Sequence, residues 1–141
     1  MVGLKSLQIL NIGYNQLHEI HYNAFIHLKN LKNADFSHNQ LNLNTGVYDI
    51  LGQVSPFNSN FELVELHLSH NNISAMHTDW IILLNKLKIL DLKYNAFNYL
   101  EVNIFKRKKP KKLSAFCFMI ISTGDKVGNF VRKRFLHNLL Y

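Results

Sequence analysis

The sequence predicts a solenoid of stacked turns that share one parallel sheet, and three observations support this prediction. An eleven-residue pattern of apolar positions closed by an asparagine, LxxLxLxxNxL, occurs four times, at residues 7–17, 31–41, 63–73 and 87–97. Its asparagines are 24, 32 and 24 residues apart. Between the copies, apolar residues such as Ile20, Phe25 and Leu28 recur at matching positions. A unit that cannot bury its apolar face alone stacks on its neighbours, so this repetition indicates a continuous core.

Each copy has the spacing of a leucine-rich repeat, whose x-Leu-x-Leu-x stretch forms a short strand. We therefore predict an α/β leucine-rich repeat solenoid over residues 1–105, a partial horseshoe with the parallel sheet on its concave face. Residues 106–141 are predicted to be a non-repeat tail. The strand positions expected to be buried are Leu10, Ile12, Leu66, Leu68, Leu90 and Leu92.

An asparagine closes every copy, and these residues are Asn15, Asn39, Asn71 and Asn95. An amide side chain both donates and accepts hydrogen bonds, so it can satisfy backbone groups that stacking would otherwise bury unpaired. Leucine, isoleucine or phenylalanine at this position could not do so. We therefore predict a structural ladder in which these asparagines bond the backbone of adjacent turns.

The repeat frame has one insertion, and it stops before the end of the chain. Between Leu41 and Leu63 the spacing is eight residues longer than elsewhere, which predicts a longer return loop with a short amphipathic turn ended by Pro56. After the fourth copy the frame requires apolar residues where Lys108 and Lys111 stand. Because burying unpaired ammonium groups is costly, the tail is expected to leave the solenoid and to be disordered or helical. The array also starts within a turn, so we expect a fragment or a truncated product.

The net charge of +7 belongs to the tail. Residues 1–102 contain six lysines against eight acids, whereas residues 103–141 contain ten basic residues against one acid. Six of the seven residues in 106–112 are basic, and this cluster is expected either to be disordered or to contact anionic lipid or nucleic acid. A single cysteine, Cys117, excludes an internal disulfide. No secretory signal or membrane span is visible in the sequence.

Side chains that flank the buried strand leucines are expected to form columns on the concave surface. Ordered polar groups on a sheet offer donors and acceptors, so we predict that this face recognises a protein partner. Its central column contains His67 between two aspartates, which favours the charged form of the imidazole. For any one of these residues taken alone, a solvated surface side chain is a simpler interpretation than a binding role. The predicted binding residues are Asn11, Asn33, Asp35, Ser37, Glu65, His67, Ser69, Asp91 and Lys93.

The chain contains no nucleophile elbow, phosphate loop or zinc-ligand spacing, so we expect no enzyme activity, no cofactor and no metal. His38 and His70 stand beside ladder asparagines, where other copies have a tyrosine, and we interpret them as turn residues. One N-glycosylation sequon is present, Asn72-Ile73-Ser74. Asn72 is expected to be exposed, and to carry a glycan if the chain enters the secretory pathway.

Three stretches carry a further resemblance: ADFSHNQL at 34–41, SPF at 55–57 followed by LVELHLSHNNIS at 63–74, and Asp79-Trp80 ahead of LDLKYN at 90–95. Residues 1–105 resemble the ectodomains of Toll and Toll-like receptors, most closely arthropod Toll receptors. The resemblance implies a horseshoe that binds a protein ligand, in arthropods a Spätzle-type cytokine, and that dimerises with a second receptor. It implies a cell-surface location for the parent receptor, although this chain shows no signal peptide, cysteine cap or membrane span.

Two function classes therefore remain open. The first is a protein-recognition module of a Toll-type receptor, for which the repeats imply no nucleic-acid binding. The second is a short intracellular leucine-rich repeat interaction protein whose basic tail targets the nucleus or a membrane. Further repeats, cysteine caps and a membrane span in an extended reading frame would establish the first class.

Overall fold

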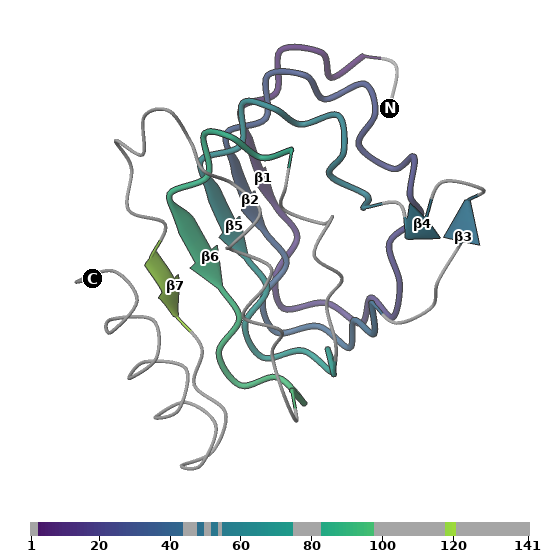
Figure 1. Ribbon diagram of the computed structural model, residues 1–141, viewed down its shortest axis with the longest axis vertical. Helices are drawn as coiled ribbons and strands as arrows, with labels where there is room; N and C mark the ends of the chain where they lie inside the picture. Colours follow the sequence, from purple (N-terminus) through teal and green to yellow (C-terminus); the bar gives the residue numbers. More distant parts are fainter. Residues whose placement is uncertain are drawn as a thin grey trace.

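Five short parallel strands form one sheet, and the chain returns over the opposite side between them (Figure 1). The computed structural model describes residues 3–43, 55–74 and 83–97 with their side chains, and the backbone of 48–49, 52–53 and 118–120. The sheet order is β1-β2-β5-β6-β7. Its strands are β1 (Ile9–Asn11), β2 (Asn33–Asp35), β5 (Glu65–His67), β6 (Ile89–Asp91) and β7 (Phe118–Ile120).

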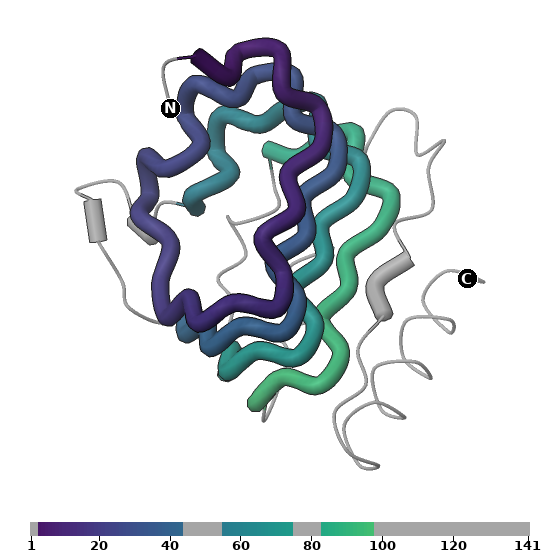
Figure 2. The backbone as a smooth tube through the Cα atoms, turned by 180° about the vertical axis from the view of Figure 1, so that it is seen from behind, coloured from purple at the N-terminus to yellow at the C-terminus, as the bar shows by residue number. Residues whose placement is uncertain are grey.

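The register of the sheet confirms the predicted repeat frame. Every neighbouring pair is parallel, and Leu10, Ala34, Leu66 and Leu90 occupy equivalent positions in successive strands. Seen from behind, the first four turns stack as similar coils (Figure 2). The described return segments contain no α-helix and are built of tight turns, in which an N–H bonds a carbonyl three residues earlier, as from Leu28 to Phe25 at 3.0 Å. Within the described residues, each repeat therefore consists of one strand and a return segment of tight turns that leads to the next strand.

The core lies between the sheet and the return segments. In the third and fourth turns Leu66, Leu68, Leu90 and Leu92 are at most 1% exposed, as predicted. The central core also contains three phenylalanine rings in mutual contact, with centroids 5.4 to 5.6 Å apart. These rings belong to Phe25, Phe36 and Phe57. Aromatic rings bury large apolar areas, so this cluster joins the first and second turns.

The prediction that Leu10 and Ile12 are buried is wrong. Both are only partly buried and pack against the edge of the core. Leu10 belongs to β1 and Ile12 follows it directly, and β1 pairs with β2 on one side only. A strand position becomes fully buried when a turn covers it on each side, so side chains in an edge strand keep part of their surface exposed.

The tail contributes a strand, so the prediction that residues 106–141 leave the sheet is wrong for residues 118–120. β7 pairs parallel with β6, and Met119 takes the position opposite Leu90. That offset is 29 residues, whereas the frame tested at Lys108 and Lys111 assumed 24. With an offset of 29 residues, the repeat frame no longer requires apolar residues at the two lysines. The helix considered for residues 127–140 lies outside the described residues.

The insertion between the second and third repeats carries a hairpin in place of the expected turn. β3 (Tyr48–Asp49) and β4 (Gly52–Gln53) pair antiparallel on the return side, away from the main sheet (Figure 1). The predicted packing of the side chains in 48–54 lies outside the described residues. After the hairpin, Ser55 is fully buried, and its Oγ accepts a hydrogen bond at 3.1 Å from the backbone N–H of Phe57. This turn directs Phe57 into the core.

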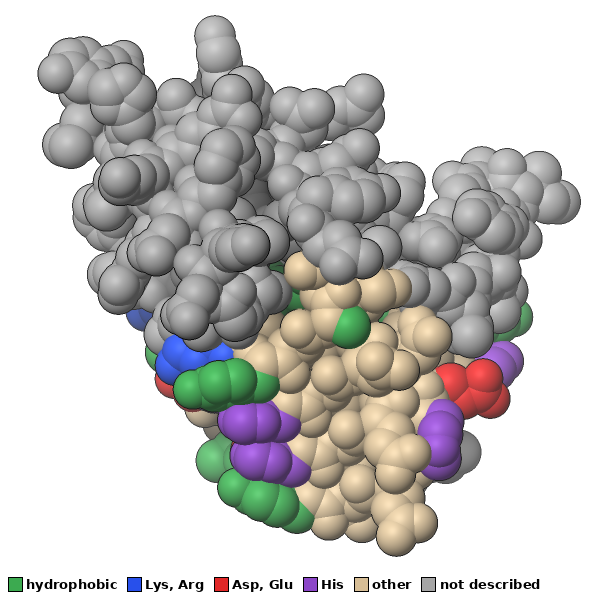
Figure 3. Space-filling view, turned by 90° about the horizontal axis from the view of Figure 1, so that it is seen from below, with side chains coloured by type: hydrophobic (Ala, Val, Ile, Leu, Met, Phe, Trp, Pro, Cys, Tyr) green, Lys and Arg blue, Asp and Glu red, His purple; other side chains and the backbone are tan. Residues whose placement is uncertain are grey.

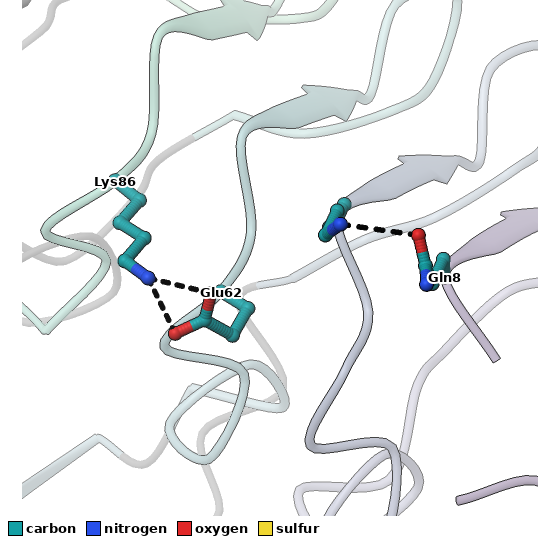
Figure 4. Close-up of polar contacts among 4 residues, drawn as sticks. Gln8, Glu62 and Lys86 are labelled. Atoms are coloured by element: carbon teal, nitrogen blue, oxygen red, sulfur yellow. Dashed lines mark hydrogen bonds and ion pairs between the residues drawn. The ribbon is translucent and has the colours of Figure 1, made fainter. Parts of the chain in front are cut away.

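Polar contacts also join successive turns at the amino ends of the strands (Figure 4). Lys86 Nζ lies 2.6 Å from both carboxylate oxygens of Glu62 in the preceding turn, and Lys32 Nζ donates to Gln8 Oε1 at 3.1 Å. All four side chains are at or near the surface, so each contact contributes at most about 1 kcal/mol. The buried core and the backbone bonds therefore dominate the stability of the stack.

Candidate protein-recognition surface

The predicted asparagine ladder is present, and Asn39 shows its geometry. Its Oδ1 accepts a hydrogen bond at 3.0 Å from the backbone N–H of Leu17, and its Nδ2 donates at 3.0 Å to the carbonyl oxygen of Ile12. Both partners belong to the preceding turn. Nδ2 also lies 3.0 Å from the carbonyl of Phe36 in its own turn. One amide therefore satisfies backbone groups of two turns at once.

Asn71 and Asn95 repeat this arrangement, accepting from the N–H groups of Leu41 and Ile73 at 2.9 and 3.0 Å. Asn15 differs, because its Nδ2 donates to the carbonyls of Ile12 and Gly13 in its own turn. The sequence did not reveal one further inter-turn bridge: Asn60, fully buried where other turns have a leucine, donates to two carbonyls of the preceding turn at 3.1 and 2.8 Å. These bridges hold the strands in fixed register, which positions the side chains of the concave face.

On the concave face, side chains from β2 and β5 form a connected polar group. Asn33 Nδ2 donates to Glu65 Oε2 at 3.0 Å, and His67 Nε2 lies 3.5 Å from the same oxygen. The side chains of Glu65 and His67 are 34% and 33% exposed, so they remain accessible to a partner. Glu65 and His67 are two residues apart in one strand and therefore project from the same face. Asn33 and Glu65, the paired positions of β2 and β5 that we call the outer column, are thus brought together.

The central column has a structural role that the sequence did not predict. Asp35 Oδ1 accepts from the N–H of Ser37 at 2.8 Å, and Asp91 Oδ1 accepts from the N–H of Lys93 at 3.1 Å. Asn11 makes the same two-residue bond to Gly13 at 3.0 Å. Each side chain caps its own strand end, as short polar side chains commonly do. The expected pairing of His67 with two aspartates is replaced by its contact with Glu65.

A third column, formed by the residues two positions after those of the central column, is mostly closed to a partner. Ser37 and Ser69 are each 8% exposed, so these two predicted binding residues offer little contact surface. Lys93, at the same position in β6's turn, is half-buried. The accessible part of the candidate surface therefore lies over the outer and central columns, where Asp35, Glu65 and Asp91 give it an acidic character. We call this set, together with Asn11, Asn33 and His67, the concave patch.

Comparison with known proteins identifies the family. The profile described as leucine rich repeat matches residues 1–41 and 59–107, well over half of the chain, and its gap falls on the insertion. The chain belongs to the leucine-rich repeat family. Repeats of this family generally serve as modules that bind protein partners.

This leucine-rich repeat chain is 30% identical to osteomodulin of Mus musculus over 97 residues, which cover 69% of the chain and 21% of osteomodulin. It is 32% identical to Protein toll of Drosophila melanogaster over 80 residues, which cover 55% of the chain and 7% of that protein. The structure resembles internalin C2 of Listeria monocytogenes with a TM-score of 0.61 and 21% identity, over 86% of this chain and 44% of the internalin. This structural likeness supports the fold alone. The chain spans less than half the length of each of these proteins.

The leucine-rich repeat turns also present a column of stacked rings. From the sequence, its histidines were expected only to be turn residues. Tyr14, His38, His70 and Tyr94 precede the four ladder asparagines, and all have positive φ angles of 53 to 55°. Their rings stack in sequence, with centroids 4.1, 4.1 and 4.2 Å apart. The sequence did contain a signal for this column, because every copy has an aromatic or imidazole ring at the same repeat position. Stacking of the turns brings equivalent positions together.

Three further properties of the leucine-rich repeat region bear on its function. Asn72 is exposed, as a glycosylation acceptor requires. Among the described residues, no group of three or more His, Cys, Asp or Glu side chains is placed to hold a metal ion. The part of the chain that the structure describes also contains no helix long and apolar enough to cross a bilayer.

Proposed function

We propose that this chain is a ligand-recognition segment of a Toll-type receptor ectodomain and that the concave patch contacts the ligand. The observation that carries this proposal is the connected polar group formed by Asn33, Glu65 and His67 on a rigid parallel sheet. Residues on strands are held more precisely than residues on loops, so a partner meets a preorganised surface and loses less entropy on binding.

The charge of the concave patch defines the partner that it fits. Asp35, Glu65 and Asp91 lie on adjacent strands and are half-buried, with no lysine or arginine among the patch residues. Two of these carboxylates each use one oxygen to cap their own backbone, which leaves the other oxygen available. Complementary charges favour binding and steer association, so the ligand should present lysine or arginine side chains to this patch.

The Toll-type assignment adds the identity of the partners. It is supported by the 32% identity to Protein toll and by the three stretches that resemble Toll ectodomains. Under this assignment the ligand is a Spätzle-type cytokine, a second receptor is the dimerisation partner, and the parent receptor lies at the cell surface. The leucine-rich repeats themselves are assigned no nucleic-acid ligand, because residues 1–102 carry more acids than lysines.

Binding of the chain to a Spätzle-type cytokine, measured by biolayer interferometry, tests the proposal. The variant Asp35→Asn/Asp91→Asn removes two charges, and its amide oxygens can still accept from the N–H groups of Ser37 and Lys93. We expect the dissociation constant to rise roughly tenfold, about 1.4 kcal/mol. The affinity of the unaltered chain should also fall as ionic strength rises.

The matched control is Glu19→Gln/Glu62→Gln, which makes the same change in charge outside the concave patch. Its affinity should stay close to that of the unaltered chain. Equal losses in the two double variants would show that only net charge matters and would overturn the assignment of the concave patch. Complete absence of binding by the unaltered chain would overturn the Toll-type assignment.

A further inference from the structure

A column of stacked rings lies on the surface, and we call it the ring column. It consists of Tyr14, His38, His70 and Tyr94. Its planes are nearly parallel, with interplanar angles of 10°, 13° and 25°. Residues other than glycine rarely adopt positive φ, and here four do so at one repeat position. Stacking between neighbouring rings offsets this backbone cost and holds the rings in place.

The ring column is exposed and rigid at the same time. Tyr14 and Tyr94 are 79% and 58% exposed, and His70 is also exposed. A spacing of about 4.1 Å leaves no room for another ring between two rungs, so a partner meets the ring edges. These edges carry phenol hydroxyls and imidazole nitrogens, which both donate and accept hydrogen bonds. Ordered aromatic side chains with polar tips are favoured at protein interfaces.

On the side of the ladder asparagines, the surface beside the ring column is uncharged. The residue that follows each ladder asparagine is Gln16, Gln40, Asn72 or Ala96, and all four are exposed. Viewed from below, two neighbouring histidine side chains lie between hydrophobic ones along one edge of a broad tan face without acidic or basic groups (Figure 3). Amide side chains, like the ring edges, are both donors and acceptors. Apart from Lys93 beside Tyr94, this face can therefore pair with a copy of itself without charge repulsion.

We propose that the ring column and its neighbouring amides form a self-association surface whose partner is a second copy of this chain. A two-fold interface brings the same patch together from both copies, so the patch must be self-complementary. In the four turns that the structure describes with side chains, the order Tyr-His-His-Tyr reads the same in both directions with nearly equal spacing. When the two columns run antiparallel, each tyrosine meets a tyrosine and each histidine meets a histidine.

Charge at the end of the ring column selects this antiparallel arrangement. Lys93 immediately precedes Tyr94, and the equivalent residue before Tyr14 is Gly13. Parallel columns would place Lys93 opposite Lys93 of the other copy, whereas antiparallel columns place it opposite Gly13. Like charges facing each other across an interface are unfavourable. Tyr14 of one copy therefore lies opposite Tyr94 of the other.

This surface is separate from the concave patch. It concerns the chain without a glycan, because a glycan on Asn72 would cover the neighbouring amides, and it rests on the ring column alone. Self-association of the chain without any cytokine therefore tests it independently of ligand recognition. Failure of one proposal leaves the other standing.

Sedimentation velocity of the full chain over a range of concentrations is the first test. The unaltered chain should dimerise reversibly, and His38→Asn/His70→Asn should raise the dimer dissociation constant at least about tenfold. Asparagine tolerates positive φ, so this variant should keep its fold, which circular dichroism can verify. The control His21→Asn/Tyr22→Asn removes another exposed ring pair, whose centroids are 4.4 Å apart, and should leave dimerisation unchanged. A monomer at every concentration, or equal effects of the two variants, would overturn the proposal.

Crosslinking tests the arrangement of the two copies. In a Cys117→Ser background, differently tagged Tyr14→Cys and Tyr94→Cys chains are mixed and treated with a short bismaleimide. The antiparallel arrangement predicts a crosslinked heterodimer from the mixture and little product from either chain alone. Crosslinking of Tyr14→Cys to itself, or absence of product from the mixture, would contradict the arrangement.

Discussion

Asn71 Oδ1 accepts a hydrogen bond at 2.9 Å from the backbone N–H of Leu41, which lies 30 residues earlier in the preceding turn. The same amide donates at 3.0 Å to the carbonyl oxygen of Phe36 in that turn. Leu41 and Phe36 are fully buried, so water does not replace these bonds. The stack of turns therefore depends on polar bridges inside an apolar core as well as on the leucines.

Replacing Asn71 by alanine should destabilise the chain by at least about 3 kcal/mol, because several buried backbone groups lose their partner at about 1–3 kcal/mol each. Urea denaturation followed by circular dichroism measures this loss. The control is Asn15→Ala, since Asn15 is exposed and its Nδ2 donates to carbonyls of its own turn. That variant should lose about 1 kcal/mol or less. Similar losses for both would contradict the inter-turn role of Asn71.

Leu68→Ala should destabilise the chain by roughly 2–5 kcal/mol, because Leu68 is fully buried and its removal leaves a cavity. Leu10→Ala removes the same atoms from a half-buried position at the edge of the core, so its loss should be markedly smaller. The two midpoints in urea provide the comparison. A larger loss for Leu10→Ala would show that the edge strand is covered in solution.

These residues also show how far the sequence could predict the fold. The period fixes which leucines and asparagines face inward, so Leu68 and Asn71 could be placed from spacing alone. Burial at Leu10 could not, because it depends on whether another turn covers the strand. β7 was missed because its segment is longer and the position equivalent to the ladder asparagine is Gly124.

The candidate site was predicted less completely, for a related reason. Spacing places Asp35, Glu65 and His67 on one face, but it cannot show how each side chain uses its hydrogen-bonding groups. Asp35 caps its own strand end, which leaves Glu65 to pair with His67. Predicting the ring column would have required both the repeat position of the rings and the positive φ angles at which they stack.

Removing residues 113–141 should expose the edge of β6, because the truncated chain lacks β7. An uncovered edge leaves backbone groups of the strand open to water. Hydrogen–deuterium exchange should then be faster in Ile89–Asp91 than in the full chain. Exchange in β2, which lies between β1 and β5, should change much less. Unchanged protection of β6 would argue against its pairing with β7.

Expression through a eukaryotic secretory pathway should add one N-linked glycan, at Asn72. Asn72 is exposed and begins the sequon, so an oligosaccharyltransferase can reach it. A single mass shift that glycosidase treatment removes, and that Asn72→Gln abolishes, is the expected result. Gln40→Asn is a suitable control, since Gln40 occupies the equivalent exposed position without a sequon. A shift that persists in Asn72→Gln would assign the glycan elsewhere.

The central claim is that the concave patch contacts the ligand. The most direct test is two-dimensional NMR of the labelled chain, titrated with a Spätzle-type cytokine. We predict that the largest changes occur at Asn33, Asp35, Glu65, His67 and Asp91, with the return segments nearly unchanged. Changes confined to the ring column or to the return segments, with the concave patch unperturbed at saturation, would contradict the account.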